Sequence, residues 1–96
     1  MSGGHFDYKQ AYLGYIADQL ERDIAYNAIP YDAAIVKDGE KYYGHQLQPQ
    51  TVEFISDVVE QLRRIENILR EYDLAVSGDS CEATFQERVG ITPNTA

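Results

Sequence analysis

The sequence of 96 residues is poor in cysteine and in cations, and it contains no tryptophan and no long apolar run. The single cysteine, Cys81, excludes an internal disulfide and cannot by itself build a zinc cluster. Eight Lys and Arg stand against 16 Asp and Glu, for a net charge of −8. Direct binding to nucleic acid or to an anionic membrane is therefore not expected. No apolar run approaches the ~20 residues that span a bilayer.

The start of the chain, MSGGHFDY, has neither the basic region nor the apolar region of a signal peptide. We therefore expect a soluble protein of the cytoplasm. The length and the 44% of hydrophobic residues predict a single domain over residues 1–96 with a modest core, and the residue patterns described below make it a helical domain. Within it we expect a flexible lead at 1–6, a hairpin or loop insert at 29–49 and a tail at 90–96.

A first helix is predicted from Tyr8 to about Ala28, with Asp7 as its N-cap and Pro30 as a stop signal. Apolar residues recur there at helical spacing: Leu13, Ile16, Ala17, Leu20 and Ile24. These residues fall within about 100° of arc, which is the width of a core-facing stripe.

Residues 29–49 are predicted to form either a β-hairpin or an irregular loop. Asp38 and Gly39 lie between two β-prone runs, and glycine accepts the positive φ of a type I′ turn. Because an isolated two-stranded ribbon is only marginally stable in water, a hairpin here must lie on the helices or on another chain.

A second, longer helix is predicted from Pro49 to Val76, with Gly78 just beyond as the terminating glycine. Its apolar residues repeat every seven positions in two series: Ile55, Leu62, Leu69 and Val76, and Val58, Ile65 and Tyr72. This pattern is typical of an a/d heptad seam. A short third helix is predicted to begin at Asp79, with Glu82 as its capping-box partner.

The predicted fold class is all-α, with two long antiparallel helices plus a short C-terminal helix. A small β-hairpin between helices 1 and 2 stays open as the alternative to a loop. The second helix is apolar over roughly half of its circumference, more than these neighbours plainly cover. We therefore expect a homodimer that forms a helical bundle. The alternative is a monomer in which the insert and the third helix cover the remainder.

Eight tyrosines in so short a chain indicate a recognition surface, because the ring offers a large apolar face with a polar tip. The candidate binding residues combine these rings with neighbouring carboxylates: Tyr8, Tyr12, Tyr15, Asp18, Glu21, Asp23, Tyr26, Tyr42 and Tyr43. Such a surface could engage a basic protein groove, including one that normally holds nucleic acid. The alternative is that the rings wrap the rim of a small core.

Motifs for catalysis and for metal binding are missing. His5, His45 and Cys81 are the only good nucleophile, base or soft-metal candidates, and their spacing supports no Cys–His pair. His5 and Asp7 supply two metal ligands at most. No P-loop, GxGxxG, HExxH or EF-hand pattern is present. We therefore expect no catalytic residue, no metal site and no cofactor, and so a protein that is not an enzyme.

Both ends of the chain carry distinctive segments: SGGHFDY at residues 2–8, LAVSGD at 74–79 and TFQER at 84–88. Together they resemble a group of small, uncharacterised bacteriophage and prophage proteins, and the resemblance implies that the insert at 29–49 is the variable part of the chain. Where others of the group tend to carry a second acidic residue after the SGD turn, this chain has Ser80 and Cys81. The resemblance implies a phage context and no catalytic residues.

The leading hypothesis is a phage-type acidic accessory protein that binds and inhibits a host protein in the host cytoplasm. An anti-CRISPR or other anti-defence factor that occupies a basic nucleic-acid-binding groove is the concrete version. One alternative is a small-ligand sponge for a nucleotide signal, in which rings stack on bases and the Ser77-Gly78-Asp79 turn holds phosphate. Another is a structural subunit of a phage assembly.

Overall fold

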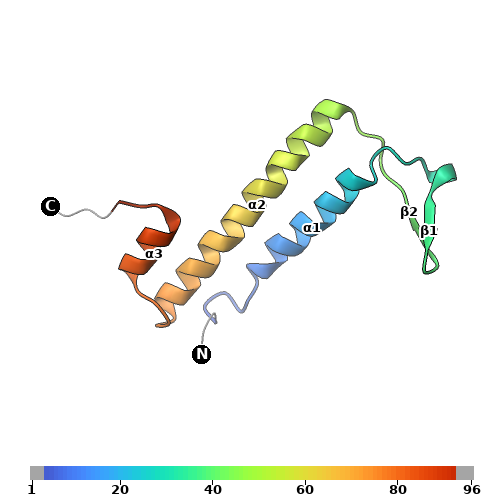
Figure 1. Cartoon of the computed structure of the whole chain (residues 1–96). Helices are drawn as coiled ribbons and strands as arrows, with labels where there is room; N and C mark the ends of the chain where they lie inside the picture. The colour runs from blue at the N-terminus through green and yellow to red at the C-terminus, as the bar shows by residue number, and fades with distance from the viewer. Residues whose placement is uncertain (1–3, 93–96) are drawn as a thin grey trace. The chain divides into compact units, whose positions relative to one another are not determined.

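The computed structural model describes residues 4–92, and within them it contains three α-helices and one β-hairpin (Figure 1). The elements are α1 (Ala11–Ala25), the 3-10 helix η1 (Tyr31–Ala33), β1 (Ile35–Lys37), β2 (Glu40–Tyr42), α2 (Pro49–Val76) and α3 (Glu82–Val89). The chain divides into two compact units. We call residues 1–14 and 63–96 the terminal unit, and residues 15–62 the hairpin unit.

The prediction of an all-α fold with two long antiparallel helices is wrong. Among the described residues α2, with 28 residues, is the one long helix, since α1 has only 15. A two-stranded antiparallel sheet accompanies the helices. The predicted helical bundle required two long helices, so that prediction is wrong as well.

α1 begins at Ala11 rather than at Tyr8, because the chain bends before it. Asp7 and Tyr8 adopt positive φ angles of 53° and 61°, outside the helical region. The backbone N–H of Asp7 donates to the carbonyl of Gly4 at 3.2 Å, which closes a turn. Asp7 therefore lies within a turn, and its predicted role as the N-cap is wrong.

α1 also ends early, at Ala25 instead of near Ala28, because the next residues fasten the chain to the segment before α2. The side chain of Asn27 accepts a hydrogen bond from the N–H of Leu47 at 2.9 Å and donates to the carbonyl of Leu47 at 3.0 Å. The N–H of Gly44 donates to the carbonyl of Ile29 at 2.9 Å. These bonds hold the base of the insert against the end of α1.

Within the insert, the chain forms the hairpin rather than the loop (green in Figure 1). β1 pairs with β2 in antiparallel register, so that Ile35 lies opposite Tyr42. Asp38 and Gly39 connect the strands with φ angles of 53° and 80°. Two positive φ angles in a two-residue loop are the geometry of a type I′ turn, as the Asp-Gly signal predicts.

α2 spans the predicted range, and its two end signals are confirmed. Pro49 occupies the first helical position, where its missing N–H costs nothing. At the other end Gly78 has a φ of 87°, and the N–H groups of Asp79 and Ser80 both donate to the carbonyl of Leu74, at 3.0 and 3.1 Å.

α3 begins at Glu82 with Cys81 as its N-cap, so the predicted capping box of Asp79 and Glu82 is wrong. The Asp79 amide is used by the turn that closes α2. At the end of α3, Gly90 has a φ of 85° and the N–H of Ile91 donates to the helix at 2.8 Å.

The expected lead and tail differ in part from what the structure describes. Residues 4–6 of the lead belong to the turns before α1, and residues 90–91 of the tail form the C-terminal cap of α3. Residues 1–3 and 93–96, which include two residues of the SGGHFDY segment, lie outside the described residues.

The core of the described residues is small. Only two hydrophobic side chains are buried, Ala17 and Val59, and both lie in the hairpin unit. Of the stripe predicted on α1, Ile16 remains 50% exposed. Four large apolar residues of α2 are more than 40% exposed: Phe54, Ile65, Tyr72 and Val76. α2 therefore keeps apolar surface that its own chain does not cover.

Candidate functional site

The hairpin unit contains a depression of about 180 Å³ between α1 and the hairpin. Its lining residues are Gln19, Arg22, Asp23, Tyr26, Glu40, Lys41, Tyr42 and Tyr43. Gln19, Arg22 and Asp23 of α1 and Tyr26, which directly follows the helix, are spaced three or four residues apart or adjacent, so they project on one side of it. The other four are consecutive residues that begin in β2. We call this the tyrosine depression.

Tyr42 organises the tyrosine depression. Its ring centroid lies 5.3 Å from that of Tyr26, and the guanidinium carbon of Arg22 lies 5.0 Å from the Tyr42 centroid, a cation–π contact. Its hydroxyl donates to Oε2 of Glu40 at 3.0 Å. This hydrogen bond, followed by partial desolvation, raises the pKa of the Tyr42 phenol above its usual range. The ring is thus contacted by Tyr26 and Arg22 and hydrogen-bonded at its tip.

A second aromatic pair joins η1, which precedes the hairpin, to the residue that follows β2. The rings of Tyr31 and Tyr43 meet edge to face with centroids 4.9 Å apart. Nζ of Lys41 lies 4.7 Å from the Tyr31 centroid and donates to its hydroxyl at 3.4 Å. Sequence reasoning missed both Arg22 and Lys41. The signal that could have found them is a cation one helical turn before Tyr26 and another directly before Tyr42.

A shallower depression of about 280 Å³ adjoins the first. It is lined by Tyr15, Asp18, Gln19 and Arg22, so the two depressions share Gln19 and Arg22. Tyr15 is 63% exposed beside it. The exposed surface of α1 in this unit therefore continues from one depression to the other.

The predicted binding residues are only partly brought together. Four of them line the tyrosine depression: Asp23, Tyr26, Tyr42 and Tyr43. Tyr15 and Asp18 line the adjoining depression, while Glu21 is exposed on α1 and lines neither. Tyr8 and Tyr12 belong to the terminal unit, where they are 54% and 61% exposed.

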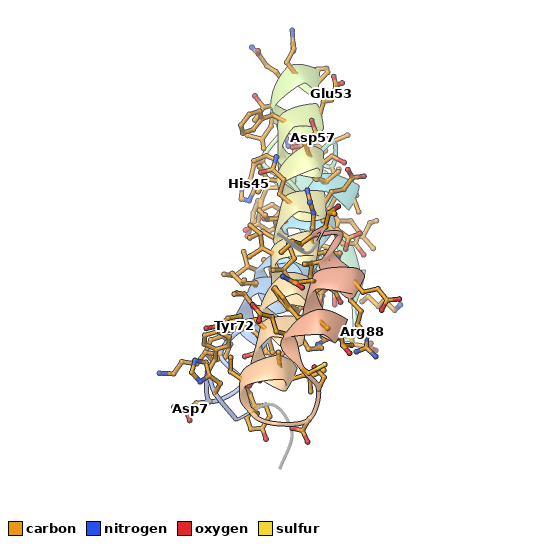
Figure 2. The ribbon with its side chains drawn as sticks, turned by 90° about the vertical axis from the view of Figure 1, so that its left-hand side faces the viewer. Asp7, His45, Glu53, Asp57, Tyr72 and Arg88 are labelled. Atoms are coloured by element: carbon orange, nitrogen blue, oxygen red, sulfur yellow. The ribbon has the colours of Figure 1, made fainter. Side chains whose placement is uncertain are left out.

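The negative charge of the chain is concentrated in the hairpin unit. Residues 15–62 carry nine carboxylates and three cations, a net charge of −6, whereas the terminal unit carries seven and five, a net charge of −2. Eight of the nine carboxylates are exposed and Asp23 is half-buried. Glu53 and Asp57, for example, extend from the first turns of α2 (Figure 2). The unit that contains these rings is therefore acidic as a whole, although the charged residues that line each of the two depressions balance one another.

The terminal unit has a different feature, a buried carboxylate. Asp73 on α2 has no exposed surface. Its Oδ1 accepts hydrogen bonds from the backbone N–H of His5 at 2.8 Å and from the hydroxyl of Ser77 at 3.0 Å. Its Oδ2 accepts from Nε2 of Gln10 at 3.2 Å. Sequence reasoning missed Asp73, although a carboxylate between Leu69 and Val76 on one helix face is a signal of burial.

Aromatic rings gather beside this carboxylate. Tyr72 packs against Phe6 with ring centroids 6.0 Å apart, against His5 at 5.9 Å and against Phe85 at 5.9 Å. Figure 2 shows Asp7 and the Tyr72 side chain on one side of the α2 ribbon and Arg88 on the other. The segments that carry the resemblance, far apart in sequence, thus meet here, which gives them a structural role.

The three groups suited to covalent chemistry, His5, His45 and Cys81, have different surroundings. Cys81 is exposed and its Sγ lies 3.4 Å from the Thr84 hydroxyl, which lowers the pKa of the thiol below its usual range. His5 is engaged in the aromatic cluster, and His45 is exposed in the hairpin unit. Within residues 4–92, no group of three or more His, Cys, Asp or Glu is placed to hold a metal ion.

In the nucleotide-binding alternative, the Ser77-Gly78-Asp79 turn was predicted to hold phosphate through backbone N–H groups. The N–H groups of Asp79 and Ser80 are both hydrogen-bonded to the carbonyl of Leu74, so they do not point toward a ligand.

Across the part of the chain that the structure describes, no helix is both long and apolar enough to cross a membrane.

The chain was compared with protein-family models, with curated proteins and with solved structures, and none of them matches it. A function for the chain must therefore be inferred from the chemistry of the described residues.

Proposed function

We propose that the chain is a protein-binding module whose hairpin unit docks on a basic surface of another protein. The observation that carries this proposal is the coincidence of two features in residues 15–62. One is a net charge of −6, and the other is a pair of adjoining depressions lined by tyrosines. Charge of one sign steers a partner of the opposite sign, and aromatic rings supply the contact area at the centre of an interface.

The tyrosine depression is organised before any partner arrives. Arg22 and Lys41 lie over the rings of Tyr42 and Tyr31, and Glu40 accepts from the Tyr42 hydroxyl. Side chains that are already ordered lose less conformational entropy when they bind. Tyr15 and Tyr43 remain 63% and 43% exposed, so they offer both an apolar face and a polar tip to a partner.

The partner class follows from charge. A protein groove that normally holds nucleic acid is lined with Lys and Arg, so an acidic protein surface competes for the same groups. The phage-like ends of the chain favour a host defence complex, such as a CRISPR–Cas effector, as that partner. The proposed mechanism is inhibition in the host cytoplasm by occupation of the groove, with no chemical step.

The test is displacement of labelled nucleic acid from purified CRISPR–Cas effector complexes, followed by fluorescence anisotropy. We expect the chain to lower the anisotropy of the labelled strand with at least one complex, and to do so less well as salt rises. The proposal is contradicted if the chain binds none of the complexes, or if it binds one and leaves the nucleic acid in place.

A second candidate is a binder of nucleotide signals. It is favoured by Arg22 and Lys41, two cations that line the depression together with Tyr26, Tyr42 and Tyr43. It is opposed by the net charge of −6 around them, which repels phosphate. A nucleotide that raises the melting temperature of the chain in a concentration-dependent way would favour this candidate over the first.

A further inference from the structure

The second half of α2 carries a row of apolar side chains that the terminal unit leaves exposed. Ile65 is 45% exposed, Tyr72 41% and Val76 47%. At ~100° per residue, the three lie within about 40° of arc on the helix. We call these three residues the α2 stripe. Asp73, which binds His5, lies on one flank of the stripe, and the Tyr72 ring borders that flank because it also packs against His5 and Phe6.

A groove of about 310 Å³ lies at the C-terminal end of the α2 stripe, between α2 and α3. It is lined by Tyr72, Ala75, Val76, Glu82 and Phe85. The ring of Phe85 meets that of Tyr72 edge-on at 5.9 Å, so α3 forms one wall. Because four of the five lining residues are apolar or aromatic, the occupant that fits is an apolar side chain.

Charge distinguishes a second copy of this chain from other partners. Residues 63–76 carry three Arg and three carboxylates, so the segment is balanced, in contrast to the hairpin unit. On the flank of the α2 stripe that faces away from Asp73, the adjacent residues are Ile68 and Ala75. α2 itself carries no charge at these two positions, and Glu82 on α3 is the one charged residue that lines the groove, so two copies meet little like-charge repulsion along this flank.

We propose that the α2 stripe pairs with the α2 stripe of a second copy, with the two helices antiparallel. Ile65 and Val76 occupy d and a positions of the heptad pattern, and antiparallel helices place such positions opposite each other. Ile65 of each copy then enters the groove beside Val76 of the other, while Leu69 lies against Tyr72. A two-fold axis makes the two contacts equivalent.

The interface consists of one helical segment and the edge of α3. It therefore buries less than the ~1,200 Å² of a stable complex, and the dimer dissociates at micromolar concentration. This inference does not depend on the proposed function, because it uses residues 63–92 only. A dimer would nevertheless carry two hairpin units, and so could bind a partner with two basic sites more tightly than a monomer.

The first test is sedimentation of the full chain from about 5 to about 500 µM. We expect the mass to rise from 10.9 kDa toward twice that value. Ile65→Lys should remain monomeric with an unchanged circular dichroism spectrum, because Ile65 is 45% exposed in the single chain. Phe54→Lys is the matched control, since Phe54 is 68% exposed on α2 in the hairpin unit, and it should dimerise like the wild type.

A wild-type chain that stays monomeric at the highest concentration overturns the proposal. So does dimerisation that survives Ile65→Lys, or dimerisation that Phe54→Lys abolishes.

Orientation is tested with two single-cysteine variants, Ile65→Cys and Val76→Cys, each made with Cys81→Ser. Antiparallel pairing predicts that an oxidised equimolar mixture forms the linked dimer efficiently, while neither variant alone does. Efficient linkage of each variant with itself, with no gain on mixing, overturns the antiparallel arrangement.

Discussion

The backbone N–H of His5 donates to Oδ1 of Asp73 at 2.8 Å, which joins two residues 68 positions apart in the chain. The carboxylate that receives this bond has no exposed surface and also binds Ser77 and Gln10. A buried carboxylate is tolerated only where hydrogen-bond donors surround it. The turns before α1 supply two of these donors, so the turns and the Asp73 carboxylate stabilise each other. The sequence predicts that the first helix begins at Tyr8. In the structure the chain instead forms turns up to Ala11, and His5 in these turns makes the contact with Asp73.

Asp73→Asn should destabilise the chain by about 2–4 kcal/mol. The amide keeps one oxygen acceptor and replaces the other with an NH₂ group, so at least one of the donors around Asp73 loses its acceptor and faces an N–H group instead. Asp79→Asn is the matched control on an exposed carboxylate and should cost no more than about 0.5 kcal/mol. Urea unfolding followed by circular dichroism measures both. Equal losses for the two variants would show that the contacts of Asp73 do not stabilise the fold.

Gly44→Ala should disrupt the base of the hairpin. A Cβ at this buried position would overlap the carbonyl of Tyr26 and the Cα of Asn27, and backbone atoms cannot move aside as a flexible side chain can. We expect a loss of about 2–3 kcal/mol in unfolding free energy. Gly4→Ala, where nothing lies within 4 Å, should change it by less than about 0.5 kcal/mol. An unchanged Gly44→Ala variant would mean that α1 and the insert are not held this closely.

Tyr42 should titrate above the usual range of a tyrosine, and Glu40→Gln should move its pKa back toward that range, because the carboxylate favours the protonated phenol. Carbon NMR of labelled tyrosine follows this directly. Since the folded pKa lies above the unfolded one, the stabilisation is complete below pH ~10 and is lost as pH rises through the folded pKa. Glu53→Gln should leave Tyr42 unchanged, and a Tyr42 pKa equal in wild type and Glu40→Gln would refute the contact.

Cys81 should react with a disulfide reagent faster at pH 7.5 than an ordinary thiol does, because hydrogen bonds lower its pKa, first from the Thr84 hydroxyl and then from backbone N–H groups. Thr84→Val should slow the reaction about 2- to 5-fold, and Thr84→Ser, which keeps the hydroxyl, should not. As the only cysteine, Cys81 accounts for the whole signal. Equal rates in all three proteins would rule out the contact.

Local signals in the sequence predict the elements that depend on local chemistry. Pro49 and Gly78 mark the ends of α2, and Asp38-Gly39 marks the turn of the hairpin, because each residue type suits the backbone geometry found there. The length of α1 depends instead on distant contacts. Its start is set by the bond from His5 to Asp73, and its end by the bonds from Asn27 to Leu47.

The sequence likewise predicts only the part of the candidate site that depends on spacing within one helix. Helical spacing predicts that Tyr15 and Tyr26 project on the same side of the first helix, whereas the contact of Tyr26 with Tyr42 comes from the hairpin. Arg22 escaped prediction because its contact with Tyr42 depends on how the hairpin folds onto α1. Periodicity within one element carries no information about such pairs.

The central claim is that the acidic surface of residues 15–62, rather than net charge alone, binds a basic partner. Two triple variants change the net charge equally, one in each unit: Asp18→Lys with Glu21→Lys and Asp23→Lys, and Asp7→Lys with Asp79→Lys and Glu87→Lys. The decisive measurement is the dissociation constant of each variant with the defence complex from which the wild type displaces nucleic acid. We predict binding at least ~10-fold weaker for the first variant and a change of less than about 3-fold for the second. Equal weakening by both, or none by the first, would contradict the claim.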